Sequence, residues 1–152
     1  QMERRDLTMS MLEIEITEET PLDQRGMNHS LDALSNAGVS IALDDFGTGF
    51  ATFAYLKKGL ISKIKIDKFF VHGIAESESD QHIVRAMVEL GEALGIKVTA
   101  EGVETEEDRD TLCKLGCNSG QGFLFAPALP MSLALDALAR SSASSRLDQA
   151  VR

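Results

Sequence analysis

Charged and amide side chains follow five short apolar segments of the sequence, at or near the point where each segment ends. Carboxylates that are forced together repel one another unless they are protonated or neutralised, and a bound cation is the usual solution. Oxygen ligands without histidine or cysteine favour hard ions such as Mg²⁺ or Mn²⁺ over Zn²⁺. Two such ions, roughly 3.5–4 Å apart, can clamp a phosphodiester for hydrolysis. In chain order the five groups are Glu15 and Glu18, Asp44 and Asp45, Lys65 and Asp67, Glu101 and Glu104, and Gln121.

A single acidic residue at the end of a strand carries little information. Helix caps and solvated charges explain most such residues. Five consecutive strands that each deliver a carboxylate, a lysine or an amide to one rim are much harder to explain in this way. The repetition therefore favours a site over five unrelated surface charges.

Short apolar strands alternate with amphipathic helices along the chain. The segment LEIEI alternates apolar and acidic residues with a period of two, which indicates a strand. Proline in a first turn and glycine after a last turn mark the expected helix ends. We expect strands over residues 12–16, 39–43, 63–66, 97–100 and 118–123, and helices over 21–38, 52–58, 80–94, 105–116 and 132–140.

Two of the expected helices have specific signals at their ends. In the helix over 80–94, the apolar stripe is expected at Ile83, Met87, Leu90 and Leu94, with Ser79 as the cap and Gly95 as the stop. In the next helix, Thr105 is expected to cap the first turn together with Asp108. The acidic residues of that turn are explained by capping and by the helix dipole.

Strands that are separated by helices of this length need crossover connections, so the sheet should be parallel. Two parallel architectures compete: an open doubly wound sheet and part of a (β/α)₈ barrel. No glycine-rich dinucleotide-binding sequence follows the first strand, as the open sheet would favour. Barrel active sites collect groups from several strand ends at the carboxyl-terminal face. The sequence therefore predicts an α/β fold of the TIM-barrel type, to which this chain contributes about five strand–helix units.

The composition restricts the class of protein. With 43% hydrophobic residues, the chain of 152 residues has enough apolar side chains for one core and is unlike a disordered chain. Its formal net charge of −9 argues against a groove that grips the phosphates of DNA or RNA polymers. No apolar run approaches the roughly 20 residues of a membrane span, so we expect no membrane contact from this segment.

The signatures that carry the strand-end residues resemble those of the EAL family, whose domains hydrolyse cyclic di-GMP to linear pGpG. The similarity extends over roughly residues 12–130, with all signatures in the order and spacing of the family. They are EITE at 15–18, DDFGTG at 44–49, KID at 65–67, AEGVE at 100–104 and QGF at 121–123. DDFGTG and AEGVE together are highly specific, so the chain is identified as a carboxyl-terminal portion of an EAL domain.

The resemblance implies roles for individual positions. Two Mg²⁺ or Mn²⁺ ions are expected, and Asp44 resembles the ligand that bridges them. Lys65 resembles the catalytic lysine near the attacking water, and Glu101 the carboxylate that holds or deprotonates that water. Asp67 and Glu104 resemble residues that support the site or touch substrate. The implied metal ligands are Glu15, Asp44, Asp45, Glu101 and Gln121.

The DDFGTG sequence also resembles a regulatory loop of the family that is coupled to dimerisation. Glu18 matches the glutamate that anchors this loop, and the two glycines let the loop change shape. The implied regulatory residues are Glu18, Phe46, Gly47, Thr48 and Gly49. We therefore expect a homodimer that forms on the side of this loop.

Two other charged residues have simpler interpretations. Glu13, within LEIEI, is expected to face the opposite side of the sheet or a solvated helix layer. Lys63 is expected to belong to a solvated patch with Lys57 and Lys58, although a dimer surface is an alternative.

The sequence departs from the family pattern in two places. The Glu-Ala-Leu-type motif, an arginine that grips substrate phosphate and an asparagine of the first metal site lie upstream of residue 1 in the family pattern. A complete barrel takes about 250 residues and eight strands. We therefore expect the chain to be part of a longer protein, with closure of the barrel by a swapped dimer as the alternative. After Gln121, Pro127 also comes one place early, which removes a basic residue that faces substrate in the family.

These observations lead to an expected function for the longer protein and for the chain alone. The parent domain is expected to be a cytoplasmic, metal-dependent cyclic di-GMP phosphodiesterase, whereas the 152 residues alone should be inactive. The alternative is a module that binds cyclic di-GMP, or only dimerises, without cleaving it. Residues 1–140 are expected to belong to the EAL domain, and residues 141–152 to a disordered polar tail.

Overall fold

Four parallel strands form one sheet in the order in which they occur in the chain. The structure is a computed structural model that describes residues 8–17, 25–47, 56–117, 119–131 and 133–134. Each strand pairs with the next one along the sequence, so the order is β1-β2-β3-β4. The strands are β1 (Glu13–Thr17), β2 (Ser40–Phe46), β3 (Lys63–Ile66) and β4 (Lys97–Ala100).

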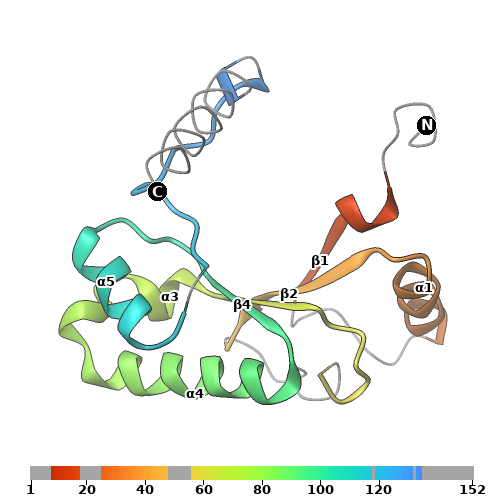
Figure 1. The fold of residues 1–152 in the computed structure, drawn as a ribbon, viewed down its shortest axis with the longest axis horizontal. Helices are drawn as coiled ribbons and strands as arrows, with labels where there is room; N and C mark the ends of the chain where they lie inside the picture. Colours follow the sequence, from red (N-terminus) through yellow and green to blue (C-terminus); the bar gives the residue numbers. More distant parts are fainter. Residues whose placement is uncertain (1–7, 18–24, 48–55, 118, 132, 135–152) are drawn as a thin grey trace, which may run out of the picture.

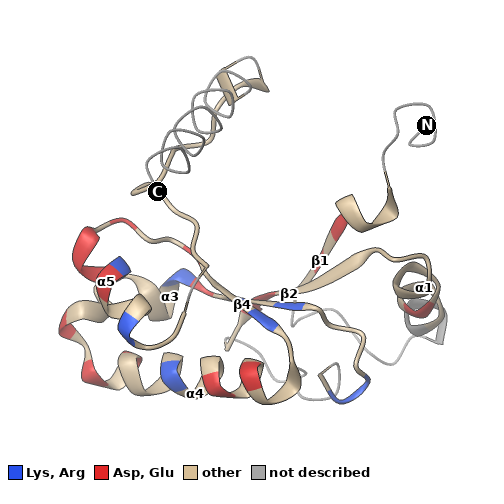
Figure 2. Ribbon diagram, viewed as in Figure 1, with Lys and Arg blue, Asp and Glu red and all other residues tan. Residues whose placement is uncertain are grey.

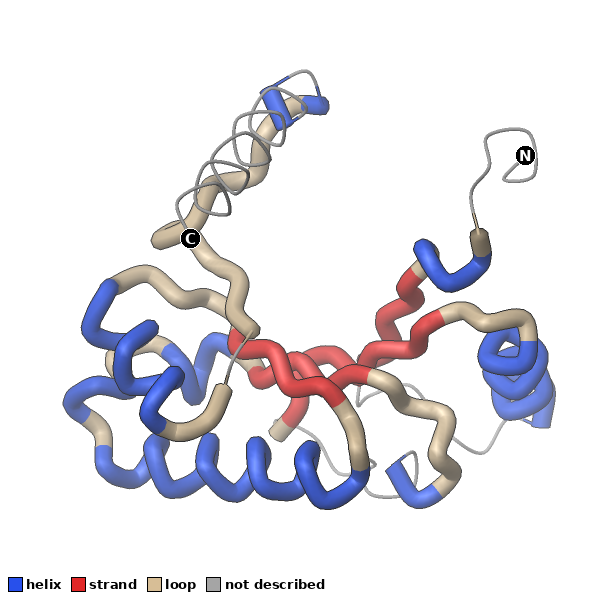
Figure 3. The backbone as a smooth tube through the Cα atoms, in the orientation of Figure 1, coloured by secondary structure: helices blue, strands red, loops and turns tan. Residues whose placement is uncertain are grey.

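Helices lie at the ends of this sheet and along one side of it. Figure 1 shows α1 beyond one end, α3 and α5 at the other end, and α4 alongside the sheet, where it contacts β3 and β4. Figure 3 shows the same division, with the strands crossing at the centre and the helices around them. The bounds are α1 (Arg25–Asn36), α3 (Lys68–Val71), α4 (Glu78–Leu94) and α5 (Glu106–Lys114), with short 3₁₀ helices η2 (Met9–Met11) and η3 (Ile74–Glu76).

The alternation of side chains along the strands separates the apolar core from the polar face. In β3, Ile64 and Ile66 are fully buried in the core, whereas Lys63 and Lys65 alternate with them. In β2, Ile41 and Leu43 belong to the same core. Because successive side chains of a strand point to opposite faces, the charged residues of neighbouring strands share one face. This face carries the candidate site.

Helix α4 covers the core with a different stripe from the one predicted. Its buried residues are Val84, Met87, Val88 and Gly91, whereas Ile83 and Leu94 remain 37% and 48% exposed. The predicted stripe was wrong at these two positions because the helix packs on an adjacent face. The cap was also misplaced, since the Ser77 side chain accepts the hydrogen bond from the Asp80 N–H. The stop at Gly95, in the left-handed conformation with φ of 67°, agrees with the prediction.

The predicted last strand, over residues 118–123, is wrong as a strand. In the part of this segment that the structure describes, pairing with β4 is limited to one parallel bridge between Ala100 and Gly120. Gly122 then turns so tightly that an added Cβ would meet the Val103 backbone. The Phe125 N–H then donates to the Gly122 carbonyl at 3.1 Å, so the chain turns here instead of continuing as a strand. The backbone nevertheless brings Gln121 beside the end of β4.

Other predicted elements agree with the structure where it describes them. The strands over 12–16, 63–66 and 97–100 are present, whereas the strand over 39–43 continues to Phe46. Leu56 and Lys57 are helical, and the rest of the predicted helix over 52–58 includes residues outside the described part. Residues 135–140 of the last predicted helix and the tail over 141–152 also lie outside the described residues.

The order of the strands identifies the architecture. A doubly wound sheet reverses its strand order near the middle, whereas consecutive units of a (β/α)₈ barrel add strands in one direction. The sheet β1-β2-β3-β4 follows the second pattern, so the α/β prediction of a TIM-type barrel is supported. The ribbon in Figure 2 is coloured for both basic and acidic residues along α4 and for acidic residues at the start of α5. Among the described residues, no helix combines the length and apolar character needed to cross a membrane.

Candidate functional site

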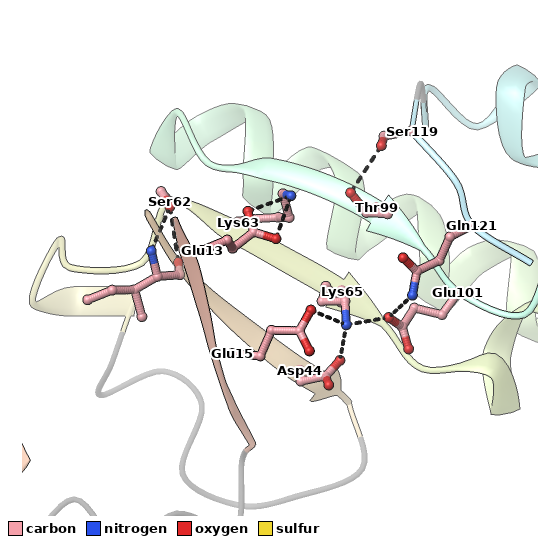
Figure 4. Close-up of polar contacts among 11 residues, drawn as sticks. Glu13, Glu15, Asp44, Ser62, Lys63, Lys65, Thr99, Glu101, Ser119 and Gln121 are labelled. Atoms are coloured by element: carbon pink, nitrogen blue, oxygen red, sulfur yellow. Dashed lines mark hydrogen bonds and ion pairs between the residues drawn. The ribbon is translucent and has the colours of Figure 1, made fainter. Parts of the chain in front are cut away.

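The Lys65 ammonium lies at the centre of a cluster of carboxylates from three other segments of the chain. Lys65 Nζ is 2.7 Å from Glu15 Oε1, 3.0 Å from Asp44 Oδ1 and 2.6 Å from Glu101 Oε1. Figure 4 shows these side chains pointing toward one another from β1, β2, β3 and the end of β4. The side chain of Lys65 is only 7% exposed. A buried ammonium is stable here because each face of it meets a negative charge.

A bulge in β2 places two consecutive aspartates near this cluster. The register between β2 and β3 shifts between Leu43 and Phe46. Within the shift, Asp45 has a φ of 54°. Among the described residues, it is the only one other than glycine with a positive φ. A bulge interrupts the strict alternation of side chains. Ligand atoms of Asp44, Asp45 and Glu101 consequently lie within 4.8 Å of one another.

Glu101 and Gln121 are fixed by backbone hydrogen bonds around the end of β4. The Glu101 N–H donates to the Ile66 carbonyl at 3.1 Å, and the Gln121 N–H donates to the Ala100 carbonyl at 2.8 Å. The Gln121 amide Nε2 then donates to Glu101 Oε1 at 2.6 Å. Gln121 therefore holds the Glu101 carboxylate from the side opposite to β3.

The pKa directions reflect the crowding of acidic groups. Burial raises the pKa of Glu101, and the neighbouring Lys65 ammonium offsets only part of this effect. Burial also raises the pKa of Asp45, and the charges on Asp44 and Asp67 add to the increase. Burial alone would lower the pKa of Lys65, but its contacts with three carboxylates outweigh this and hold the pKa above its ordinary value. The site thus combines one firmly protonated ammonium with an excess of carboxylates.

The donor atoms of the cluster fit a hard divalent cation. Asp44 Oδ1 is buried and, among the described residues, accepts no well-aligned hydrogen bond, although the Lys65 ammonium is 3.0 Å away. A buried carboxylate oxygen needs a positive charge beside it, which the ammonium supplies here and a metal ion would also supply. Asp44, Asp45 and Glu101 offer oxygen atoms only, which suits Mg²⁺ or Mn²⁺ better than Zn²⁺.

Asp67 and Glu104 lie at the margin of the cluster. Asp67 caps α3, where its carboxylate accepts a hydrogen bond from the Phe69 N–H at 2.8 Å. Its charge is close enough to Asp45 to raise the pKa of that residue. Glu104 is directed to His72, with 3.9 Å between Oε2 and Nδ1, and both side chains are largely exposed. Support or substrate contact stays a prediction for both.

The described part of the expected regulatory loop packs against the core. Phe46 is 5% exposed. An added Cβ on Gly47, whose φ is 103°, would lie 2.6 Å from the Met87 side chain and 2.8 Å from the Phe70 ring. The backbone there admits little except glycine. The other expected loop residues, Glu18, Thr48 and Gly49, lie outside the described residues.

A pocket of about 540 Å³ adjoins the carboxylate cluster. Glu101 and Gln121 form its boundary with the cluster, and Lys68 and Phe123 lie in its wall. Phe123 is 72% exposed, so its ring is available to a ligand. A polar floor beside an exposed aromatic ring and a lysine suits an anionic ligand with a flat base.

A second ion pair, between Glu13 and Lys63, was missed by the sequence analysis. Glu13 was expected to face the opposite side of the sheet or a solvated helix layer, and Lys63 to belong to a solvated patch. The expectation for Glu13 is wrong, because it lies on the face of Glu15, with 2.6 Å between Glu13 Oε2 and Lys63 Nζ and 2.8 Å between Oε1 and Nζ. The signal was present in the spacing. Glu13 and Glu15 are two residues apart in β1, as are Lys63 and Lys65 in β3, so each pair shares one face.

Comparison with known proteins places these residues in a family. The model of the family described as "EAL domain" matches residues 2–128. The bifunctional diguanylate cyclase/cyclic di-GMP phosphodiesterase MucR of Pseudomonas aeruginosa is 43% identical over 137 residues, which cover 90% of this chain and 20% of MucR. The cyclic di-GMP phosphodiesterase PdeL of Escherichia coli is 40% identical over 120 residues, covering 78% of this chain and 33% of PdeL. The chain thus spans a third or less of the length of these relatives.

Solved structures agree with this assignment. The cyclic di-GMP complex of the MucR phosphodiesterase has a TM-score of 0.78 and 42% identity, covering 88% of this chain and 54% of that one. The EAL domain of Mycobacterium smegmatis DcpA has a TM-score of 0.84 and 36% identity, covering 91% and 63%. A manganese and cyclic di-GMP complex of Klebsiella pneumoniae BlrP1 has a TM-score of 0.72 and 40% identity, covering 78% and 31%. In family and in fold, this chain belongs to the EAL domain family.

Proposed function

We propose that the longer protein to which this chain is expected to belong hydrolyses cyclic di-GMP to linear pGpG with the help of two Mg²⁺ or Mn²⁺ ions. The observation that carries this proposal is the convergence of Glu15, Asp44 and Glu101 on Lys65, with Asp45 beside them. Relatives named as cyclic di-GMP phosphodiesterases, among them PdeL and PA2567, support the choice of reaction. The manganese and cyclic di-GMP complex of BlrP1 supports the choice of ion and substrate.

The residues that would hold the ions are those whose oxygen atoms face the cluster. When bound, divalent ions at such a site neutralise the phosphodiester and lower the pKa of water. Asp44 would be one of these ligands, because its carboxylate lies between the Lys65 ammonium and the oxygen atoms of Asp45 and Glu101. The proposed ligands are Glu15, Asp44, Asp45, Glu101 and Gln121.

The side chains of the chain itself can handle the proton and the charge of the reaction. Hydrolysis forms a bond from a water oxygen to phosphorus and breaks the bond from phosphorus to the 3′ oxygen. The proton that leaves the water for Glu101 is returned to the 3′ oxygen, directly or through solvent, so the product is a linear dinucleotide with a 5′ phosphate. Glu101, whose pKa is raised by burial, is suited to accept the proton of the water. Lys65 remains protonated and stabilises the negative charge that develops on the phosphoryl group.

The pocket beside Glu101 is the proposed place for part of the dinucleotide. Lys68 would face a phosphate, and the exposed ring of Phe123 would face a base. Asp67 and Glu104 would support the rim, as their positions at the margin of the cluster suggest.

The hydrolysis proposal is tested by incubating the intact protein with cyclic di-GMP and Mg²⁺ or Mn²⁺. We expect pGpG to accumulate, as measured by liquid chromatography with mass spectrometry. Excess EDTA should stop the reaction, because the carboxylates alone carry no Lewis acid. If cyclic di-GMP binds but is not cleaved, the hydrolysis proposal is wrong, and the protein is a binding module.

We further propose that a homodimer forms on the side of the DDFGTG loop. The resemblance of DDFGTG at 44–49 to the family's loop that is coupled to dimerisation supports this. Sedimentation equilibrium of the intact protein tests the proposal, and a monomer at all concentrations would contradict it.

A further inference from the structure

The Glu13–Lys63 ion pair lies one step along the strands from the contact between Glu15 and Lys65. Both oxygen atoms of Glu13 are within 2.8 Å of the Lys63 ammonium, and the two side chains are 34% and 27% exposed. Figure 4 shows this pair beside the cluster, with Glu13 and Glu15 on the same strand. The two lysines therefore make equivalent contacts with two glutamates on β1.

The register of the sheet shows that Lys63 has a second possible partner. Lys63 lies opposite Ala42 on β2, and Ala42 lies opposite Glu15 on β1. Lys63 and Glu15 thus occupy one row across three strands, about 10 Å apart at the backbone. Ala42 between them is fully buried and contributes only a methyl group. Extended lysine and glutamate side chains can meet across this distance.

Lys65 already makes a comparable contact. It comes two residues after Lys63 in β3, and it reaches back to Glu15 at 2.7 Å. Glu15 is therefore within reach of the ammonium groups of both Lys65 and Lys63. In the structure, the Lys63 ammonium is paired with Glu13 instead. If Lys63 turned to Glu15, the negative charge of Glu15 would be neutralised by two lysines, and less of it would remain for a cation.

We propose that Glu13 is a positioning residue that holds Lys63 away from Glu15 and so keeps Glu15 available to Lys65 and to a divalent cation. This inference rests on the divalent-cation part of the proposed function and does not require catalysis. Glu13 itself does not touch the cation or the substrate. By binding Lys63, Glu13 leaves Lys65 as the one lysine of this pair that contacts Glu15.

The test is Mn²⁺ binding to the intact protein without substrate, measured by isothermal titration calorimetry. Glu13→Gln frees Lys63 and should weaken Mn²⁺ binding by about three- to fivefold, as for the loss of one partly exposed charge contact. Adding Lys63→Met removes the competing ammonium, so the double variant should return to within about twofold of the original affinity.

A matched control separates this effect from a change in net charge. Lys97 lies opposite Lys63 on β4 and is exposed, so it is one strand further from Glu15. Glu13→Gln with Lys97→Met has the same net charge as the double variant above, but it leaves Lys63 free. We expect this control to bind Mn²⁺ as weakly as Glu13→Gln alone.

The outcomes are decisive in either direction. Equal rescue by Lys97→Met, no rescue by Lys63→Met, or unchanged affinity in Glu13→Gln would each overturn the inference. If Glu13→Gln does not fold, the Mn²⁺ affinity of Lys63→Met alone provides the test. An affinity equal to or higher than that of the original protein supports the inference, and an affinity about tenfold lower overturns it. Mn²⁺ binding without hydrolysis would contradict only the proposed reaction, whereas a protein that binds no Mn²⁺ would overturn both proposals.

Discussion

At the scale of single residues, Asp45 determines how two neighbouring carboxylates reach one cluster. Its φ of 54° lies in the left-handed region, which costs an ordinary L-residue roughly 1–2 kcal/mol. Without this turn, Asp44 and Asp45 would point to opposite faces of β2. The residue types and their order could be read from the sequence. The bulge could not, because an apolar pattern gives no signal for an extra residue, and the strand was expected to end at Leu43.

The strain at Asp45 makes a prediction about stability. In EDTA, Asp45→Gly should be more stable than Asp45→Ala by about 1 kcal/mol, because glycine adopts positive φ without a steric cost. The measurement is urea-induced unfolding followed by circular dichroism. Equal midpoints for the two variants would show that the left-handed backbone at this position carries no strain.

Asp44 makes a prediction about the ions. Asp44→Asn should weaken Mn²⁺ binding by more than about a hundredfold, since a direct ligand contributes more than the outer-shell partners whose loss costs 10–100-fold. Asp32→Asn, at an exposed position of α1, is the matched control and should leave binding unchanged. Calorimetry without substrate measures both variants. Retained affinity in Asp44→Asn would contradict its assignment as a ligand.

At the scale of elements, the start of α5 was predictable, but the partner of its cap was not. Thr105 accepts a hydrogen bond from the Asp108 N–H at 3.1 Å and donates to Asp108 Oδ2 at 2.8 Å, as the capping pattern indicates. The other oxygen of Asp108 accepts from the Ala75 N–H at 3.2 Å, which links α5 to η3. Local spacing predicts the first two contacts. The third joins residues 33 positions apart, and only the packed fold brings them together.

The buried Asp108 therefore contributes more than a cap. Asp108→Ala should destabilise the protein by about 2–3 kcal/mol, because it leaves the Ala75 N–H and the Thr105 hydroxyl without their charged partner. Glu107→Ala, at the neighbouring exposed position, should change stability by less than about 0.5 kcal/mol. Urea unfolding compares the two variants. Similar effects at both positions would contradict the structural role of Asp108.

At the scale of the whole molecule, the sequence predicted the parallel α/β architecture and the rim to which the polar residues belong. It predicted these because strand and helix periods alternate and because several strand ends carry ligands. It failed where tertiary contacts decide: the buried face of α4 is rotated onto Val84 and Val88, and the segment after α5 makes one bridge instead of a strand. Periodicity cannot distinguish adjacent apolar faces of a helix or foresee a tight turn against another backbone.

The site residues that the family pattern places outside this sequence lead to a prediction about the 152 residues by themselves. A polypeptide of these 152 residues should hydrolyse cyclic di-GMP at least about 100-fold more slowly than the longer protein to which we expect it to belong. The family pattern places a phosphate-binding arginine and a metal-binding asparagine outside this sequence, and the loss of one charge-stabilising group costs 10²–10³ in rate. Comparison of pGpG production per mole of protein tests this. Ordinary turnover by the 152 residues would indicate closure of the barrel by a second copy.

The order β1-β2-β3-β4 also has a consequence during synthesis. Among the described strands, β2, β3 and β4 each pair with the strand made just before them, so these three strands can pair as soon as they leave the ribosome. The sheet can grow along one advancing edge as each helix emerges and covers the apolar side. Gln121, which holds Glu101, comes from the last described turn beside β4. The ligand cluster is thus completed only after the scaffold that supports it has been made.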